Sequence, residues 1–166
     1  MRVIGIVGWK NNGKTTLVVK LVEHFTRAGL SVSTIKHAHH SVEIDKPGKD
    51  TWRHREAGAR EVLLATSKRW ALMHEMAGED DAPLDELLPR LSPCDLVVVE
   101  GFKRFPHAKI EVHLVERGRP LLAHGDPTVV AVASNHIIDP PPPVPVIDIN
   151  DIDAIAALAL ARAEPA

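Results

Sequence analysis

The segment of residues 8–15 constrains the fold of this chain more than any other. It reads Gly-Trp-Lys-Asn-Asn-Gly-Lys-Thr, a full match to the pattern Gly-x-x-x-x-Gly-Lys-(Ser/Thr), and a second hydroxyl follows at Thr16. The apolar, β-branched run of residues 2–7 before it is typical of a buried parallel strand. Apolar residues then recur at helical spacing from Leu17 to Phe25. A strand, a glycine-rich turn and a helix in this order predict a loop that binds phosphate groups.

The chemistry of such a loop is specific. Glycines allow successive backbone N–H groups to point into one concavity, and the N-terminus of the following helix adds partial positive charge. The motif assigns Lys14 to the β- and γ-phosphates and the Thr15 hydroxyl to a Mg²⁺ ion. The residues predicted to hold the phosphates are Gly8, Asn11, Asn12, Gly13, Lys14, Thr15 and Thr16. A nucleoside triphosphate with Mg²⁺ is therefore the expected ligand.

Composition excludes several other classes of protein. The net charge of −2 provides no basic field that would attract nucleic acid or an anionic membrane. Tyrosine is absent and aromatic residues make up only 4% of the chain, so stacking platforms for nucleic-acid bases are not expected. The single cysteine, Cys94, cannot form an internal disulfide and fits a reducing cytoplasm. We expect a cytoplasmic protein, because no apolar run reaches membrane-spanning length.

The rest of the chain alternates strand and helix patterns, which predicts an α/β fold. Parallel strands are expected at residues 31–36, 95–101, 128–133 and 144–149, and helices at 50–57, 83–91 and 152–163, with Asp50 as the cap of the first of these helices. Antiparallel additions are expected as a hairpin of residues 61–66 and 69–76, and as a half-exposed strand, 109–116, paired with 121–124. The predicted fold is a P-loop NTPase three-layer sandwich, a mostly parallel sheet with antiparallel additions, in one nucleotide-binding domain of residues 1–166.

An acidic residue completes the predicted metal site. Glu100 ends the most continuous apolar strand, and in phosphate-loop proteins an acidic residue at that place completes the Mg²⁺ shell. Asp95 lies at the opposite end of the same strand, which places it across the sheet from the phosphates. Thr15 and Glu100 are therefore the first two predicted metal ligands.

The loop of residues 37–49 follows a strand that neighbours the phosphate loop, where open α/β sheets bind ligands. We expect Asp45 or Asp50 to contact the metal, and Lys46 or Lys49 to contact phosphate. A competing interpretation is a transition-metal site, because the loop carries three imidazoles, those of His37, His39 and His40.

Further side chains are candidates for binding phosphate, a second substrate or the base. Lys103 belongs to the segment 101–109, which directly follows Glu100 and is therefore expected near the nucleotide; His37, Lys49 and Arg53 are candidates of the same kind. Asn135 follows the strand after which guanine-nucleotide proteins usually carry Asn-Lys-x-Asp. Because the lysine and the aspartate are missing here, this motif leaves the identity of the base open.

Several motifs together resemble the MobB family, the adaptor proteins of molybdopterin-guanine dinucleotide biosynthesis. The matching segments are residues 8–16, Ile-Lys-His-x-His-His at 35–40, the stretch 45–59 from Asp-Lys-Pro-Gly-Lys-Asp to Glu-Ala-Gly-Ala, and Val-Glu-Gly-Phe-Lys at 99–103 leading to 109–111. The resemblance implies a GTP-binding homodimer with weak GTPase activity. It implies a MobA-type molybdopterin guanylyltransferase as partner, with molybdopterin or its guanine dinucleotide as the molecule handled.

Two other activities fit parts of the sequence. A P-loop small-molecule kinase would use basic side chains such as Arg53 and Lys103 to close over the phosphates. A metal-insertion GTPase, for example one that delivers nickel, would use the histidines of the 37–49 loop. No motif places a water-positioning residue, and no arginine finger is evident in cis, so slow turnover is expected.

Overall fold

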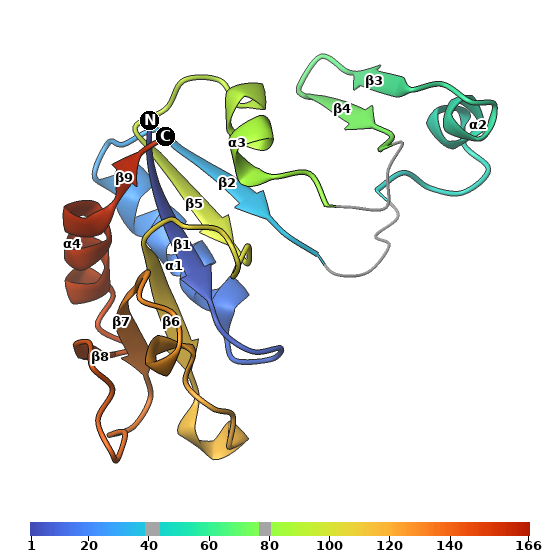
Figure 1. Ribbon diagram of the computed structural model, residues 1–166. Helices are drawn as coiled ribbons and strands as arrows, with labels where there is room; N and C mark the ends of the chain where they lie inside the picture. Colours follow the sequence, from blue (N-terminus) through green and yellow to red (C-terminus); the bar gives the residue numbers. More distant parts are fainter. Residues whose placement is uncertain (39–43, 77–80) are drawn as a thin grey trace. The chain divides into compact units, whose positions relative to one another are not determined.

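The computed structural model describes residues 1–38, 44–76 and 81–166 (Figure 1). The chain divides into two compact units. The first unit contains residues 1–37 and 84–166, and the second contains residues 38–83. None of the helices in the described residues is long and apolar enough to cross a membrane.

The first unit is built on a seven-stranded sheet. Its order is β2-β5-β1-β6-β7-β8, with β9 paired beside β1. The strands are β1 (Arg2–Val7), β2 (Val32–Lys36), β5 (Leu96–Glu100), β6 (Lys109–His113), β7 (Val129–Ser134), β8 (Val146–Asp148) and β9 (Glu164–Pro165). All pairings are parallel except that of β9 with β1. The predicted α/β class and mostly parallel sheet are confirmed; the short strand β9 was not expected.

Helices cover the sheet because alternate side chains of its central strands point to opposite faces. On one face, Ile4 and Ile6 of β1 join a core with α1 (Lys14–Arg27) and α4 (Ile152–Arg162) (Figure 1). On the other face, Val3 packs with Leu84 of the short helix α3 (Leu84–Leu87), which leads into the 3₁₀ turn η1 (Leu88–Arg90). Burial on both faces accounts for the continuous apolar runs of β1 and β5. The expected single helix over 83–91 is thus α3 followed by η1.

The expectation of a half-exposed strand at residues 109–116 was wrong, because every residue of β6 is buried. Its polar side chains are covered by the segment between β6 and β7, which contains the 3₁₀ turns η2 (Val115–Arg117) and η3 (Leu122–His124). The Glu111 carboxylate accepts hydrogen bonds from the backbone N–H groups of Leu122 (2.9 Å) and Ala123 (3.0 Å). The predicted strand at 121–124 is therefore a turn held by a buried carboxylate.

His107 lies just before β6 in a similarly buried position. Its side chain is 8% exposed, and neither ring nitrogen has a hydrogen-bond partner among the described residues. Burial, reinforced by the nearby Lys109 ammonium and opposed by Asp126, lowers the pKa of His107 to about 4. The folded state therefore holds this imidazole neutral under conditions in which an unfolded histidine is protonated.

We expect His107 to make the free energy of unfolding depend on pH. Because the folded-state pKa lies below the ordinary value, stability is full above about pH 6.5 and falls as the pH drops towards 4, by about 2–3 kcal/mol. Urea unfolding at a series of pH values measures this, and His107→Leu should flatten the profile between pH 6.5 and 4. The exposed residue His124 offers the matched control, His124→Leu, which should leave the profile as in the wild type. An unchanged slope in His107→Leu would contradict the assignment.

The described residues of the second unit form a hairpin and a helix. Strands β3 (Glu61–Ala65) and β4 (Trp70–His74) pair antiparallel, as predicted, and α2 (Asp50–Glu56) precedes them. The N-cap of α2 is Lys49 rather than Asp50, which is the first helical residue. A carboxylate is favourable in that first turn because it faces the positive end of the helix dipole.

Candidate phosphate-binding site

The phosphate loop has the backbone that its sequence predicts. Gly8 and Gly13 have φ values of +142° and +83°, and Asn11 also has a positive φ, 64°. Gly8 lies directly against β6, since a Cβ atom there would be 2.5 Å from the carbonyl oxygen of Val112. The same oxygen accepts a hydrogen bond from Nδ2 of the buried Asn12 side chain at 3.3 Å. Two contacts with one carbonyl group therefore hold the loop against the sheet.

The helix that follows presents its N-terminus and the motif lysine. Gly13 is the N-cap of α1, and Lys14, Thr15 and Thr16 form its first turn, where backbone N–H groups have no partner within the helix. Lys14 Nζ donates to the carbonyl oxygen of Trp9 at 2.8 Å. Burial lowers the pKa of Lys14, and the charge of Lys103 lowers it further. A positive helix end and a partly desolvated ammonium form an arrangement suited to an anion.

The two predicted metal ligands lie together. Thr15 Oγ1 donates to Glu100 Oε1 at 2.9 Å, although the two residues belong to different elements, α1 and β5. Glu100 is the last residue of β5 and is nearly buried. A hydroxyl and a carboxylate are hard oxygen donors of the kind that Mg²⁺ prefers, so this pair fits the metal expected with a triphosphate. Asp95, at the other end of β5, is bound to Ser31 at 2.6 Å, away from this pair.

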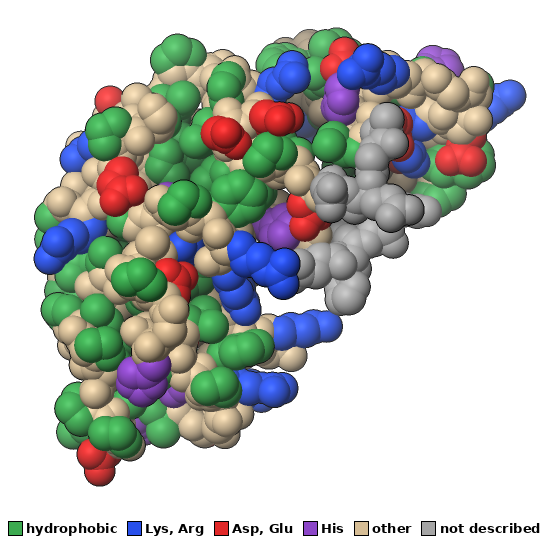
Figure 2. Space-filling view, in the orientation of Figure 1, with side chains coloured by type: hydrophobic (Ala, Val, Ile, Leu, Met, Phe, Trp, Pro, Cys, Tyr) green, Lys and Arg blue, Asp and Glu red, His purple; other side chains and the backbone are tan. Residues whose placement is uncertain are grey.

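Lys103 and His37 also lie near this edge of the sheet. The Lys103 ammonium is 4.5 Å from the centre of the Trp9 ring, and burial lowers the pKa of this lysine. The backbone N–H of His37 donates to the carbonyl oxygen of Glu100 at 2.9 Å, and its ring packs on Phe102. Lys and Arg side chains gather in Figure 2 where Figure 1 places the phosphate loop and the end of β2.

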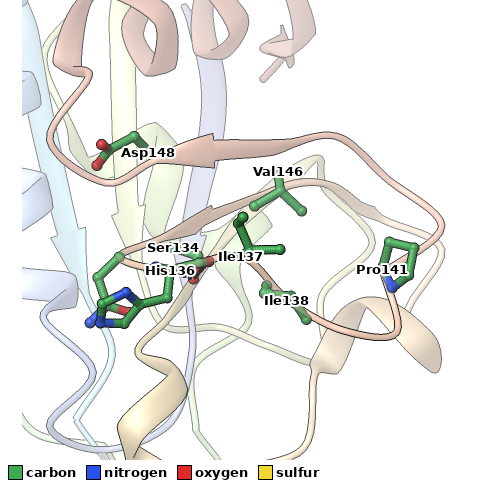
Figure 3. Close-up of a pocket in the computed structure, with 8 residues that line it drawn as sticks. Ser134, His136, Ile137, Ile138, Pro141, Val146 and Asp148 are labelled. Atoms are coloured by element: carbon green, nitrogen blue, oxygen red, sulfur yellow. Dashed lines mark hydrogen bonds between the residues drawn. The ribbon is translucent and has the colours of Figure 1, made fainter.

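Asn135 follows β7 and lines a pocket of about 570 Å³ (Figure 3). The pocket is lined by Ser134, Asn135, His136, Ile137, Ile138, Pro141, Val146 and Asp148. Asn135 Oδ1 accepts from the backbone of Val115 (3.2 Å), and Nδ2 donates to Glu116 Oε2 (2.7 Å). These bonds tie Asn135 to the loop after β6, so a contact with a base would have to replace them.

The remaining candidates belong to the second unit. Asp45 forms a two-pronged pair with Arg55, at 3.0 Å and 3.3 Å, and its carboxylate is nearly buried. Arg55 also binds Glu75 at 3.1 Å. Ligation of a metal by Asp45 would require this pair to open. Of the other candidates of this unit, Lys49 is the N-cap of α2, Asp50 is its first residue, and Arg53 lies in its last turn.

The described residues contain no group of three or more His, Cys, Asp or Glu side chains placed to hold a metal ion. Of the three histidines on which the transition-metal interpretation depends, His39 and His40 lie outside the described residues.

Lys36 is a residue at this edge that motif reasoning did not select as a site residue. Its ammonium is 3.4 Å from Glu100 Oε1, the oxygen that also accepts from Thr15. The sequence shows that Lys36 is the last residue of its strand, as Glu100 is the last residue of β5. Only the pairing of those two strands, however, shows that the residues are neighbours.

The fold is that of an α/β protein with a mostly parallel central sheet, and the predicted phosphate and metal ligands lie at one edge of that sheet. A family model, described as molybdopterin guanine dinucleotide synthesis protein B, matches residues 3–135, and the chain belongs to this family, MobB.

Two curated relatives are similar over most of their length. Both are molybdopterin-guanine dinucleotide biosynthesis adapter proteins. The one from Haemophilus influenzae is 42% identical over 155 residues, covering 92% of this chain and 84% of the relative. The one from Escherichia coli is 39% identical over 156 residues, covering 92% and 88%.

Solved structures agree with the family. A MobB homolog from Bacillus stearothermophilus matches with a TM-score of 0.73 and 27% identity over 97% of both chains. MobB from Bacillus subtilis matches with a TM-score of 0.75 over the full length of both chains; at 23% identity this likeness concerns the fold alone.

Proposed function

We propose that this chain is a GTP-binding adaptor of molybdopterin-guanine dinucleotide biosynthesis, which assists the guanylyltransferase and hydrolyses GTP slowly at most. The observation that carries the nucleotide part is the contact of Thr15 with Glu100 beside the Lys14 ammonium. This contact assembles, from two separate elements, the oxygen ligands and the cation that a Mg²⁺-triphosphate needs.

The adaptor role is proposed from the names of the relatives, which match most of this chain. Molybdopterin or its guanine dinucleotide is then the molecule handled, and a MobA-type guanylyltransferase is the partner. We also propose a cytoplasmic homodimer. The β3–β4 hairpin supports association with a second copy, because its large apolar side chains are exposed: those of Leu63, Leu64, Trp70 and Leu72.

We propose the pocket at Asn135 as the place of the base. It lies after β7 and β8, at the edge of the sheet where β1 leads into the phosphate loop. The two are linked through the loop after β6, since Trp9 Nε1 donates to Pro120 and Asn135 binds Glu116. Asp148 is among the residues that line the pocket (Figure 3), and one oxygen of its carboxylate, Oδ1, accepts from the backbone and the side-chain amide of Asn150. A carboxylate accepts from the N–H groups of guanine but finds no matching pair of donors on adenine, which supports GTP over ATP.

Calorimetric titration with GTP and ATP, each with Mg²⁺ or with EDTA, tests this proposal. We expect GTP with Mg²⁺ to bind best. Glu100→Gln should weaken that binding by roughly tenfold and leave binding in EDTA nearly unchanged, because the charge lost is the one that serves the metal.

The exposed helix residue Glu86 provides the matched control, and Glu86→Gln should bind as the wild type does. A clear preference of the wild type for ATP would overturn the guanine assignment. An equal loss with and without Mg²⁺ in Glu100→Gln would overturn the metal role.

A further inference from the structure

Lys36 occupies a defined place beside the metal ligands. Strands β2 and β5 are parallel, and their last paired residues are Lys36 and Glu100. Glu100 is in turn paired with Ile6 of β1, the strand that leads into the phosphate loop. Residues opposite each other on adjacent strands project to the same face, so the Lys36 and Glu100 side chains leave the sheet side by side. Backbone register, rather than a chance side-chain position, therefore sets their proximity.

One oxygen of Glu100 serves two partners. Glu100 Oε1 accepts from Thr15 Oγ1 at 2.9 Å and lies 3.4 Å from Lys36 Nζ. The Glu100 carboxylate is nearly buried, whereas the Lys36 side chain is 59% exposed. The ammonium thus places positive charge at the carboxylate that is expected to serve Mg²⁺. Because its stem is flexible and largely in solvent, Lys36 can leave this contact without disturbing the core.

Positive charges predominate around Lys14. Lys36 and Lys103 each lower the pKa of Lys14 through their positive charge, while Glu100 raises it. The ammonium groups of Lys36 and Lys103 are therefore both close enough to act on that of Lys14. Lys14 and Lys103 are half-buried, and Lys36 is the exposed member of the three. A polyanion bound at this edge of the sheet relieves the repulsion between the ammonium groups. Lys36, the most exposed of these lysines, is the one best able to move to the outermost phosphate of such an anion.

We propose that Lys36 binds the terminal phosphate of the triphosphate, its ammonium moving from Glu100 to that phosphate and leaving a carboxylate that would hold Mg²⁺. This deepens the GTP-binding function proposed above and rests on it. Lys36 then distinguishes a triphosphate from a diphosphate, since only the triphosphate reaches it. In the nucleotide-free protein the same ammonium offsets the charge of Glu100 and keeps the carboxylate in place beside Thr15.

The test compares GTP with GDP, both with Mg²⁺, by calorimetric titration of the full chain. Lys36→Met keeps the length of the stem and removes the charge. We expect it to weaken GTP binding by roughly tenfold and GDP binding by less than about twofold. Lys36→Arg should keep the preference for GTP, because it retains a cation of similar reach. Lys36→Gln repeats the neutral substitution with a polar side chain, should the methionine variant prove unstable.

The outcomes separate this inference from the function on which it rests. Lys20→Met, a lysine of α1 beyond its first turn, is the matched control and should bind both nucleotides as the wild type does. Equal losses for GTP and GDP in the neutral variants, or no loss for either, overturn the role of Lys36 while leaving nucleotide binding intact. Failure of the wild type to bind either nucleotide overturns the proposed function and the role of Lys36 together.

Discussion

Replacement of Lys14 by alanine is expected to weaken GTP binding by more than about 100-fold, the largest loss from any single side chain of the loop. Its ammonium is already positioned, because it donates to the carbonyl oxygen of Trp9 inside the loop. Burial lowers its pKa because the charged ammonium is partly desolvated, and a bound phosphate offsets this unfavourable desolvation. The free energy of unfolding should change by less than about 1 kcal/mol, since the lost hydrogen bond is offset by removal of a partly desolvated charge.

Titration with GTP and urea unfolding measure the two effects of Lys14→Ala. Lys10 is an exposed lysine of the same loop, and Lys10→Ala should keep most of the affinity. Added to an assay of molybdopterin guanylyltransferase, Lys14→Ala should stimulate no more than buffer does. Stimulation that persists without nucleotide binding would show that the adaptor role needs no nucleotide.

Gly8→Ala should also abolish GTP binding, but through the backbone, and it should destabilise the fold by about 3 kcal/mol. The φ of Gly8 is +142°, and the new Cβ would lie 2.5 Å from the carbonyl oxygen of Val112. Both obstacles are backbone features, so no side chain can turn away to make room. The loop or β6 must shift, and either movement breaks the concavity formed by the N–H groups.

Gly29→Ala is the control that separates the effect of the steric clash from the effect of a positive φ. Gly29 has a φ of +86°, but nothing lies within 4 Å of the position that a Cβ atom would take there. We expect a loss of about 1 kcal/mol from backbone strain, with GTP affinity unchanged. Unfolding curves and GTP titrations of the two variants make the comparison. If Gly8→Ala bound GTP like the wild type, the close approach of the loop to β6 would have no functional role.

The parts of the fold that the sequence predicted well are those whose signals are local. The strand before the loop, the loop itself and α1 are consecutive, so spacing and glycine positions are sufficient to predict them. The hairpin of β3 and β4 was predicted for the same reason, since a short turn joins two apolar runs. Glu100 was selected as a candidate metal ligand because the end of a buried strand is visible in the sequence itself.

The errors come from contacts between distant segments. The alternation of polar and apolar residues in β6 is the pattern of a strand with one face in water, yet both faces are buried. Its charged residues are buried with partners: Lys109 with Asp126 and Thr128, and Glu111 with the backbone of η3. The alternation shows which residues of a strand are polar. It does not show whether those residues form hydrogen bonds with water or with another segment of the chain.

Lys36 and Asn135 show the same limit within the candidate site. Lys36 ends β2, but its closeness to Glu100 depends on which strand pairs with β2, which no local pattern reveals. Asn135 was predicted from its place after a strand, and that place is as expected. Its bonds to Val115 and Glu116 depend on the path of a loop whose sequence pattern is that of a strand.

The order of the strands has a consequence for how the phosphate loop forms during synthesis. β1 leaves the ribosome first, yet its partners β5 and β6 follow much later in the chain, with Arg2 paired to Leu96 and Gly5 to Lys109. The groups that shape the loop, the carbonyl of Val112 and the carboxylate of Glu100, arrive equally late. A nascent chain therefore carries the whole glycine motif long before the candidate phosphate site can form, and that site is complete only when the central strands of the sheet have paired.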